Sequence, residues 1–412
     1  MKVLLAICCL KLLCLSLRAA TFICDDASQA EVAAVIAGTS PGDTVVVPAD
    51  PTPRDWSPGI SISGITLQGP GRNAASGVTI TDGTVTITKH ATHYTRMIGF
   101  KFTRTSGGVG SVLTASGGPS LKAYICESNH FNASYSHALQ LKNGGVFAEC
   151  SFAAASPFMG TGITVESDNQ TTSWSDSPTL GALDTTGESN VYFEDCYYTN
   201  ILQSISDTDE GGRSVIRHSI IQDSSIIAHG GGTSDGGNDT SLTGNKHTEI
   251  YKNTFVRQLA SANLNEWVQI RGGGCVIISN VIPSNTSGDF PNKLELELSV
   301  GCDEGAYPRP YQVGQTTYSP ADATPDFPVL IFGNTGDGTD DSNFLVISEN
   351  PNNSCADPDA FITLNRDYFL SNQWSWAPYT YPHPLRSQGE GEVVDAVVRV
   401  QKLRALRIPL RR

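Results

Sequence analysis

Cationic side chains gather in the middle of the chain, where they could act on an acidic sugar polymer. Such chemistry removes a proton beside a uronate carboxylate and expels the glycosidic oxygen, so it needs a neutralising cation and a base. Arg271 is followed by three glycines, and small residues beside an arginine let a bulky ligand approach the backbone. We therefore expect Arg271 to be the neutraliser or the base. The other candidate catalytic residues are His229, Lys246, His247 and Arg217.

Three neighbouring side chains are candidates for binding the same polymer. Trp267 lies four residues before Arg271 and could stack on a sugar ring. Arg213 and Asp235 are candidate polar contacts with the substrate. The alternative is structural, because an arginine can also tether a loop by donating hydrogen bonds to backbone carbonyls.

A cluster of acidic residues precedes these cations. Asp207, Asp209 and Glu210 lie in a Ser-Asp-Thr-Asp-Glu segment, and alternate residues of an extended segment point the same way. Carboxylate oxygens are ligands for Ca²⁺, so the three residues are candidate metal ligands. A solvated acidic turn is the alternative interpretation.

The same acids allow a second kind of reaction. Glycoside hydrolysis uses two carboxyl groups that flank the scissile bond. Asp207 or Asp209, paired with Asp235 or Asp239, could supply them. The chain contains no H-E-x-x-H or P-loop motif, which excludes the commonest zinc peptidases and nucleotidases.

The composition favours an exported all-β protein. The 412 residues include 40 Gly and only 3 Met, and the formal charge of −14 disfavours nucleic acid as a partner. Residues 1–20 resemble a secretory signal, and no later stretch is apolar enough to span a membrane. Seven of the ten cysteines follow residue 20, and among these Cys302 and Cys355 are a plausible disulfide pair, although an odd number cannot all pair.

A short phrase recurs along residues 97–282, roughly every twenty to thirty residues. In each copy an apolar start is followed by a small polar residue and, two positions later, by an aromatic or branched one. Irregular repetition of short β-rich units is typical of a β-solenoid. We expect the polar slot to face inward and its asparagines to bond along the solenoid axis; it holds Asn129, Cys150, Cys196, Ser219, Asn253 and Asn280.

The ends of the repeat carry their own signals. Residues 28–38 predict a short helix with Ser28 as its N-cap, and residues 44–48 predict a first strand. A helix there would cover the terminal edge of the solenoid. Residues 378–385 suggest an aromatic closing segment, and residues 387–412 form a tail to which we assign no role.

Residues 27–385 resemble the right-handed parallel β-helix superfamily that includes pectate lyases. The helix and the Pro-Gly-Asp-Thr-Val-Val-Val-Pro start carry this resemblance. More narrowly, the chain resembles secreted bacterial and metagenomic β-helix proteins of largely undefined activity, through Asp209-Glu210-Gly211-Gly212-Arg213, His229-Gly230, Arg271-Gly272-Gly273 and Tyr381-Pro382-His383-Pro384-Leu385. The superfamily resemblance implies an all-β, single-stranded right-handed parallel β-helix over residues 21–386, with an N-terminal helical cap and an irregular closing segment.

The resemblance leaves the function open, because β-helices carry lyases, hydrolases, epimerases and adhesins alike. The leading expectation is a secreted polysaccharide lyase that cleaves a uronate-containing glycan in a lateral groove, and Ca²⁺ is its candidate cofactor. A non-catalytic glycan-binding module and a glycoside hydrolase are the alternatives. The oligomeric state is open.

Overall fold

The computed structural model describes most of the chain. The described residues are 19–72, 77–104, 111–118, 120–132, 138–158, 160–167, 184–202, 204–229, 245–258, 266–282, 294–298, 313, 328–336, 345–349 and 362–386. Asp235, Asp239, Cys302, Cys355, most of the signal segment and the tail lie outside them, so the predictions made for these parts stay predictions.

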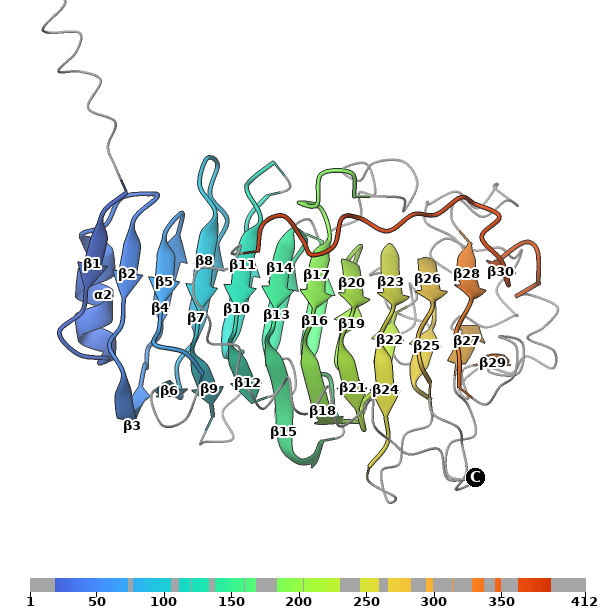
Figure 1. The fold of residues 1–412 in the computed structure, drawn as a ribbon, viewed down its shortest axis with the longest axis horizontal. Coiled ribbons are helices and arrows are strands. Elements are labelled where there is room, and N and C mark those ends of the chain that lie inside the picture. Colours follow the sequence, from blue (N-terminus) through green and yellow to red (C-terminus); the bar gives the residue numbers. More distant parts are fainter. Residues whose placement is uncertain are drawn as a thin grey trace, which may run out of the picture.

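Three parallel sheets run along the molecule (Figure 1). Over residues 44–270 the chain visits the 12-stranded, then the 8-stranded and then the 10-stranded sheet in each coil, whereas the described strands beyond them belong only to the 12-stranded and 10-stranded sheets. Every strand except those at the ends of a sheet therefore pairs with the strand one coil earlier and one coil later. This arrangement confirms the predicted parallel β-helix.

The 12-stranded sheet includes the first and the last strand of the described chain. In spatial order it contains β1 (Thr21–Ile23), β2 (Thr44–Val46), β5 (Thr66–Gln68), β8 (Thr95–Ile98), β11 (Tyr124–Glu127), β14 (Gly145–Ala148), β17 (Val191–Glu194), β20 (Arg213–Arg217), β23 (His247–Tyr251), β26 (Gly274–Ile278), β28 (Val329–Phe332) and β30 (Tyr368–Phe369).

The other two sheets complete each coil. The 10-stranded sheet contains β4 (Ile60–Ser63), β7 (Val85–Thr88), β10 (Leu113–Ser116), β13 (Leu139–Lys142), β16 (Ile163–Glu166), β19 (Asp207–Thr208), β22 (Ile226–Ala228), β25 (Val268–Ile270), β27 (Leu294–Leu298) and β29 (Leu345–Glu349). The 8-stranded sheet contains β3 (Asp50–Asp55), β6 (Val78–Thr81), β9 (Lys101–Thr103), β12 (His130–Asn132), β15 (Ser151–Phe158), β18 (Tyr197–Ile201), β21 (Ile220–Gln222) and β24 (Thr254–Val256).

Alternation of apolar and polar residues sets the two faces of each sheet. In β4, Ile60 and Ile62 are buried while Ser61 and Ser63 are exposed, as the period of two in a strand requires. Equivalent apolar residues stack coil upon coil and form one continuous core. Among the described residues, no helix is long and apolar enough to cross a membrane.

The predicted polar slot forms a hydrogen-bonded ladder inside the solenoid. The side-chain oxygen of Asn280 accepts bonds from the backbone and side-chain amides of Asn253, and that of Asn334 accepts the same pair from Asn280. Cys150 and Cys196 occupy the slot as buried thiols, as expected, and the five described cysteines are free. Two residues later, Phe102, Phe131, Phe152 and Tyr198 stack ring on ring.

Replacing Asn280 with alanine is expected to cost at least about 2 kcal/mol of unfolding free energy. The change removes four side-chain bonds and leaves buried donors and acceptors of neighbouring coils unpaired. Chemical denaturation would measure the loss. Ser61→Ala, at an exposed position, is the control and should change stability by less than about 0.5 kcal/mol; equal effects would contradict the ladder's role.

A short helix covers the N-terminal end of the solenoid. Helix α2 (Gln29–Ala37) follows Ser28, whose hydroxyl accepts a bond from the N–H of Glu31. Val32 packs into the core, and the indole of Trp56 donates to the carbonyl of Ala27. The predicted helical cap and its N-cap residue are confirmed.

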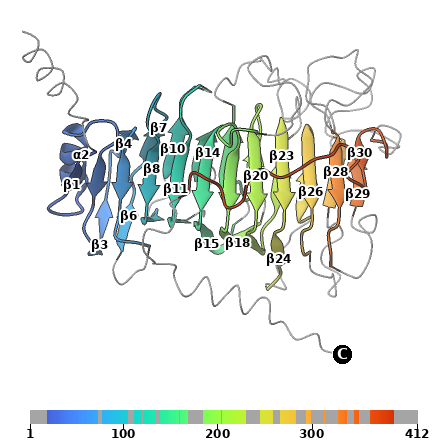
Figure 2. The ribbon, with the colours of Figure 1, turned by 45° about the horizontal axis from the view of Figure 1, so that its top comes forward.

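The other end of the described chain turns back over the 12-stranded sheet. We call residues 370–386 the C-terminal strap; in Figures 1 and 2 it runs as a red segment from β30 toward β11. Trp376, Tyr379 and Leu385 pack on an apolar cluster of the outer face, which includes Tyr192 and Tyr251. Residues 378–385 therefore close the fold along one side and not only at its end.

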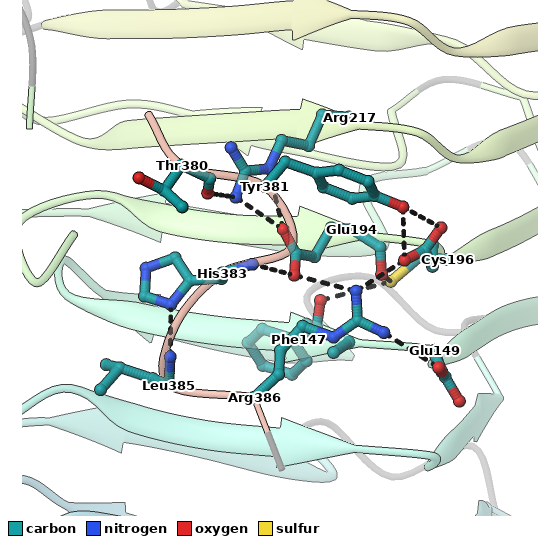
Figure 3. Close-up of polar contacts among 12 residues, drawn as sticks. Phe147, Glu149, Glu194, Cys196, Arg217, Thr380, Tyr381, His383, Leu385 and Arg386 are labelled. Atoms are coloured by element: carbon teal, nitrogen blue, oxygen red, sulfur yellow. Dashed lines mark hydrogen bonds and ion pairs between the residues drawn. The ribbon is translucent and has the colours of Figure 1, made fainter. Parts of the chain in front are cut away.

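Buried charges fasten the strap to the sheet (Figure 3). Glu194 accepts bonds from Arg217 and from the strap's Arg386 and His383 backbone N–H, at 2.7 to 3.1 Å. Arg217 also donates to the carbonyls of Tyr379 and Thr380. Glu194 and Arg217 are fully buried, so this network stabilises the fold from within.

Candidate functional site

Polar side chains form two rows on the outer face of the 10-stranded sheet. In the first row the strand register brings Asp207, Ile227, Gln269 and Glu295 side by side on β19, β22, β25 and β27. Two residues further along the chain, on the same outer face, the second row contains Asp209, His229, Arg271 and Glu297. Neighbouring coils are about 4.8 Å apart, so adjacent members of a row touch.

We call eight residues of this face the acidic patch. It consists of Asp207, Asp209, His229, Glu266, Gln269, Arg271, Glu295 and Glu297. All come from four consecutive coils, and the outer face of a parallel sheet aligns them because every coil repeats the same register. Four of the residues predicted from the sequence, Asp207, Asp209, His229 and Arg271, are thus brought together.

His229 links the two aspartates at one end of the acidic patch. Its Nδ1 lies 2.6 Å from Oδ1 of Asp207 and 3.7 Å from Oδ2 of Asp209. Burial alone would lower the pKa of His229, but the charge of Asp207, helped by Asp209, outweighs burial and raises it. The imidazole therefore holds its proton more tightly than an exposed histidine does, with Asp207 as its nearest carboxyl partner.

Asp209 differs from Asp207 in exposure and in protonation. Its side chain is 34% exposed, against 10% for Asp207. Burial of the carboxyl group, reinforced by the charge of Asp207 and opposed by His229, raises the pKa of Asp209 to about 6. The patch thus combines an accessible carboxyl group of raised pKa with a more buried carboxyl neighbour.

A chain of hydrogen bonds continues along the rows at the other end. Arg271 Nε donates to Oε1 of Glu297 at 2.9 Å. The amide nitrogen of Gln269 donates to Oε2 of Glu297 and to Oε2 of Glu295, at 2.8 Å each. Burial raises the pKa of Glu297, although the Arg271 guanidinium opposes the shift. One amide nitrogen therefore holds two carboxyl groups close together.

Glu266 completes this end of the patch, at the start of β25. Its pKa is raised to about 7, first by burial and then by the negative charges of Glu295 and Glu297. Within the part of the chain that the structure describes, no hydrogen bond or ion pair is formed by its carboxyl group, although Glu266 is only 8% exposed. Carboxyl groups with raised pKa values in a polar cluster are typical of acid–base sites.

The raised pKa makes Glu266 a source of pH-dependent instability. Because the folded state holds this proton more tightly than the unfolded chain, its contribution is favourable below pH 4.5 and lost as the pH rises through about 7. Glu266→Gln should therefore stabilise the protein by about 3 kcal/mol at pH ~8 and hardly at all at pH ~4.5. Melting temperatures of the wild-type and variant proteins at the two pH values would show this difference. An equal rise in melting temperature at both pH values would contradict the raised pKa assigned to Glu266.

Other predicted residues lie away from the acidic patch. Arg213, Arg217 and His247 are buried on the 12-stranded sheet. Arg217 serves the strap, Arg213 Nε donates to the side chain of Asn190, and His247 Nε2 contacts Glu249 at 3.0 Å. These three cations lie on the 12-stranded sheet, whereas Arg271 directly follows β25 of the 10-stranded sheet. Their placement therefore does not fit the prediction that they contact the same substrate as Arg271.

Trp267, Lys246 and Glu210 were also predicted to belong to the site, and the structure places each of them differently. Trp267 is 2% exposed and packs edge-on against Phe255 in the core, so its ring is unavailable for stacking on a sugar. Lys246 is buried in the turn that leads into β23; the N–H of the preceding Asn245 donates to the His229 carbonyl. Glu210 occupies a left-handed turn beside Asp209.

A metal site was predicted at Asp207, Asp209 and Glu210, and the structure places another side chain among these acids. Among the described residues, no group of three or more His, Cys, Asp or Glu side chains is placed to hold a metal ion. His229 stands between the two aspartates instead.

Sequence reasoning missed four members of the patch: Glu266, Gln269, Glu295 and Glu297. A signal was present for two of them, because Leu294-Glu295-Leu296-Glu297-Leu298 alternates apolar and acidic residues with period two. This strand lies in the Pro-rich stretch 283–328, which we expected to be irregular. Glu266 and Gln269 flank an apolar pair and carry no signal of their own.

Comparisons with known proteins give only distant likenesses. No family profile and no curated sequence matches the chain. Among solved structures, an alginate lyase from Paenibacillus sp. str. FPU-7 is similar with 11% identity over 85% of this chain and 98% of the other, at a TM-score of 0.26. A GH87 alpha-1,3-glucanase catalytic domain has 9% identity over 82% and 69%, at 0.35. DFA-IIIase from Arthrobacter chlorophenolicus A6 has 10% over 81% and 92%, also at 0.35. These likenesses assign no activity.

Proposed function

We propose that the protein is a carbohydrate-active enzyme that hydrolyses glycosidic bonds at the acidic patch. The observation that carries the proposal is the contact of two unlike carboxyl groups with one imidazole: Asp207 is ion-paired to His229, while the more exposed Asp209 has a pKa of about 6. Glycoside hydrolysis needs one carboxyl group as an acid and a second as a carboxylate. Asp209 protonates the leaving oxygen, and Asp207 is the second carboxylate.

The remaining residues have supporting roles. His229 contacts and orients both aspartates. Arg271 and Gln269 are fixed by Glu297 and present donors toward the hydroxyl groups of a sugar chain. The rows run along the solenoid, so an extended polymer can cross several coils. Secretion, predicted from residues 1–20, belongs to the same proposal, because such polymers are extracellular.

The β-elimination expected from the sequence fits this geometry less well. The bases proposed for it, Arg271 and His229, both contact carboxyl groups, and the raised pKa of His229 reduces the fraction of imidazole that is free to accept a proton. A uronate substrate would also have to enter a patch in which carboxyl groups outnumber cations. Hydrolysis by paired carboxyl groups needs neither a free base nor a neutralising cation.

A panel of neutral, amino-sugar and uronate polysaccharides tests the proposal, with Ca²⁺ or EDTA in parallel. New reducing ends without the ultraviolet absorbance of unsaturated uronates would support hydrolysis. Reducing ends accompanied by that absorbance, and lost in Arg271→Ala, would replace hydrolysis by the lyase reaction. Binding without any new ends in the panel would favour the glycan-binding module.

A further inference from the structure

We infer that the glycan bound at the acidic patch is positively charged, carrying free amino groups on its sugar rings. The inference rests on the proposed function and names its substrate class. It starts from the charge of the patch, which exceeds what hydrolysis requires.

The patch holds more carboxyl groups than a hydrolase uses. Two carry out the reaction, whereas five are present: Asp207, Asp209, Glu266, Glu295 and Glu297. Two cationic side chains oppose them, and each is already engaged, His229 with Asp207 and Arg271 with Glu297. The surplus of negative charge lies at the Glu266 end, where only the neutral Gln269 stands between Glu295 and Glu297.

Glu266 is an independent sign that a ligand belongs at this end. A buried carboxyl group normally has a hydrogen-bond partner. Glu266 is only 8% exposed, yet within the described chain its carboxyl group forms no hydrogen bond or ion pair, and its strongest charged neighbours are Glu295 and Glu297, ahead of Arg271. Burying three carboxyl groups together is unfavourable unless something positive or hydrogen-donating joins them.

A primary ammonium group has the required chemistry. It carries one positive charge and three N–H donors, so it can bond to several carboxylate oxygens at once. Bonds between an ammonium and a carboxylate are short and about twice as strong as neutral ones. An ammonium group bound between Glu266 and Glu295 would neutralise the surplus charge and return the pKa of Glu266 toward its usual range.

The whole chain favours the same class of ligand. A formal charge of −14 attracts cationic polymers and repels uronates over a Debye length, about 8 Å at physiological salt. A metal ion is the other cationic occupant, but the described residues offer no cluster that could hold one. An amino-sugar chain supplies positive charge at intervals along the same direction as the rows.

Calorimetric titration would test the inference with glucosamine, N-acetylglucosamine and galacturonate oligosaccharides of equal length, at about pH 6 in low salt, where the amines are charged. Asp209→Asn is the protein used, so that the ligand is not cleaved during the titration. We expect the glucosamine oligomer to bind at least about tenfold more tightly than its acetylated form, and the preference to weaken as salt is added.

Two variants locate the effect within the patch. Glu295→Gln, in the Asp209→Asn background, should remove most of the preference for the free amine. Glu166→Gln is the matched control, because Glu166 faces outward on the same sheet but is paired with Lys142 at 2.6 Å. If both variants lost the preference for the free amine equally, the preference would come from the overall negative charge of the protein and not from a specific site, which would overturn the inference.

The outcomes separate this inference from the proposed hydrolysis. Cleavage of a neutral glycan by the wild-type protein, together with equal binding of the free and acetylated oligomers, would overturn the inference and leave hydrolysis standing. Tight, salt-sensitive binding of the glucosamine oligomer without any cleavage would support the charge selectivity and overturn the hydrolase. Tighter binding of galacturonate would overturn the inference.

Discussion

Glu194→Ala is expected to reduce the free energy of unfolding by about 3–5 kcal/mol, the largest loss we predict for a single substitution. Glu194 is fully buried and accepts bonds from Arg217, Arg386 and the His383 backbone. Its removal leaves the guanidinium of Arg217 charged and buried without a carboxylate, although the bonds to Tyr251 and to the strap remain. Denaturant titration would measure the loss, and limited proteolysis would show whether the strap is released.

The other end of the strap supplies a control. Arg386 also bonds to Glu149 at 2.9 Å, but the side chain of Glu149 is 36% exposed. Exposed ion pairs contribute little, so Glu149→Ala should cost at most about 1 kcal/mol. If the two variants lose the same stability, the strap is held by its apolar contacts alone, and the buried network is not what fastens it.

The strap also explains why several cations were assigned to the wrong surface. Arg213, Arg217 and His247 lie in the central coils, as an active site would. Arg217 is instead bound to carbonyls of Tyr379 and Thr380, more than 160 residues away along the chain. Contacts over such separations cannot be derived from local patterns, because nothing near Arg217 in the sequence indicates what covers it.

The fold, in contrast, could be predicted because each coil repeats a local pattern. The inward slot of Asn253 and Asn280, the aromatic stack from Phe102 to Tyr198 and the cap at Ser28 were all expected. Each depends on residues a few positions apart in one coil. Trp267 shows the limit, since an aromatic beside polar residues has the same local pattern whether it faces the core or a ligand.

Half of the acidic patch was predictable for the same reason. Asp207 and Asp209 alternate on one strand, and His229 and Arg271 each precede glycines, so their types and spacing suggested chemistry. Glu295 and Glu297 became part of the site only through the register of β27 on β25. No motif in the sequence specifies that register.

Asp209→Asn is expected to lower kcat/KM for glycan hydrolysis by about 10²–10⁴, the range typical of losing a general acid. Asparagine keeps the size of the side chain but has no proton to give to the leaving oxygen. The side chain is partly exposed and Oδ1 accepts only the backbone N–H of Glu210, so the melting temperature should change little. Initial rates of reducing-end release, measured beside thermal melts, would separate lost chemistry from lost stability.

The pH dependence of kcat/KM tests directly whether Asp209 is the general acid. The acid must be protonated to act, so wild-type kcat/KM should fall as the pH rises through about 6, the pKa of Asp209. Asp209→Glu should retain part of the activity and move this limb, whereas the residual activity of Asp209→Asn should lack it. A limb that persists unchanged in Asp209→Asn would assign the proton to another group. Glu266, with its pKa of about 7, would then be the next acid to replace, and its glutamine variant would decide between the two ends of the patch.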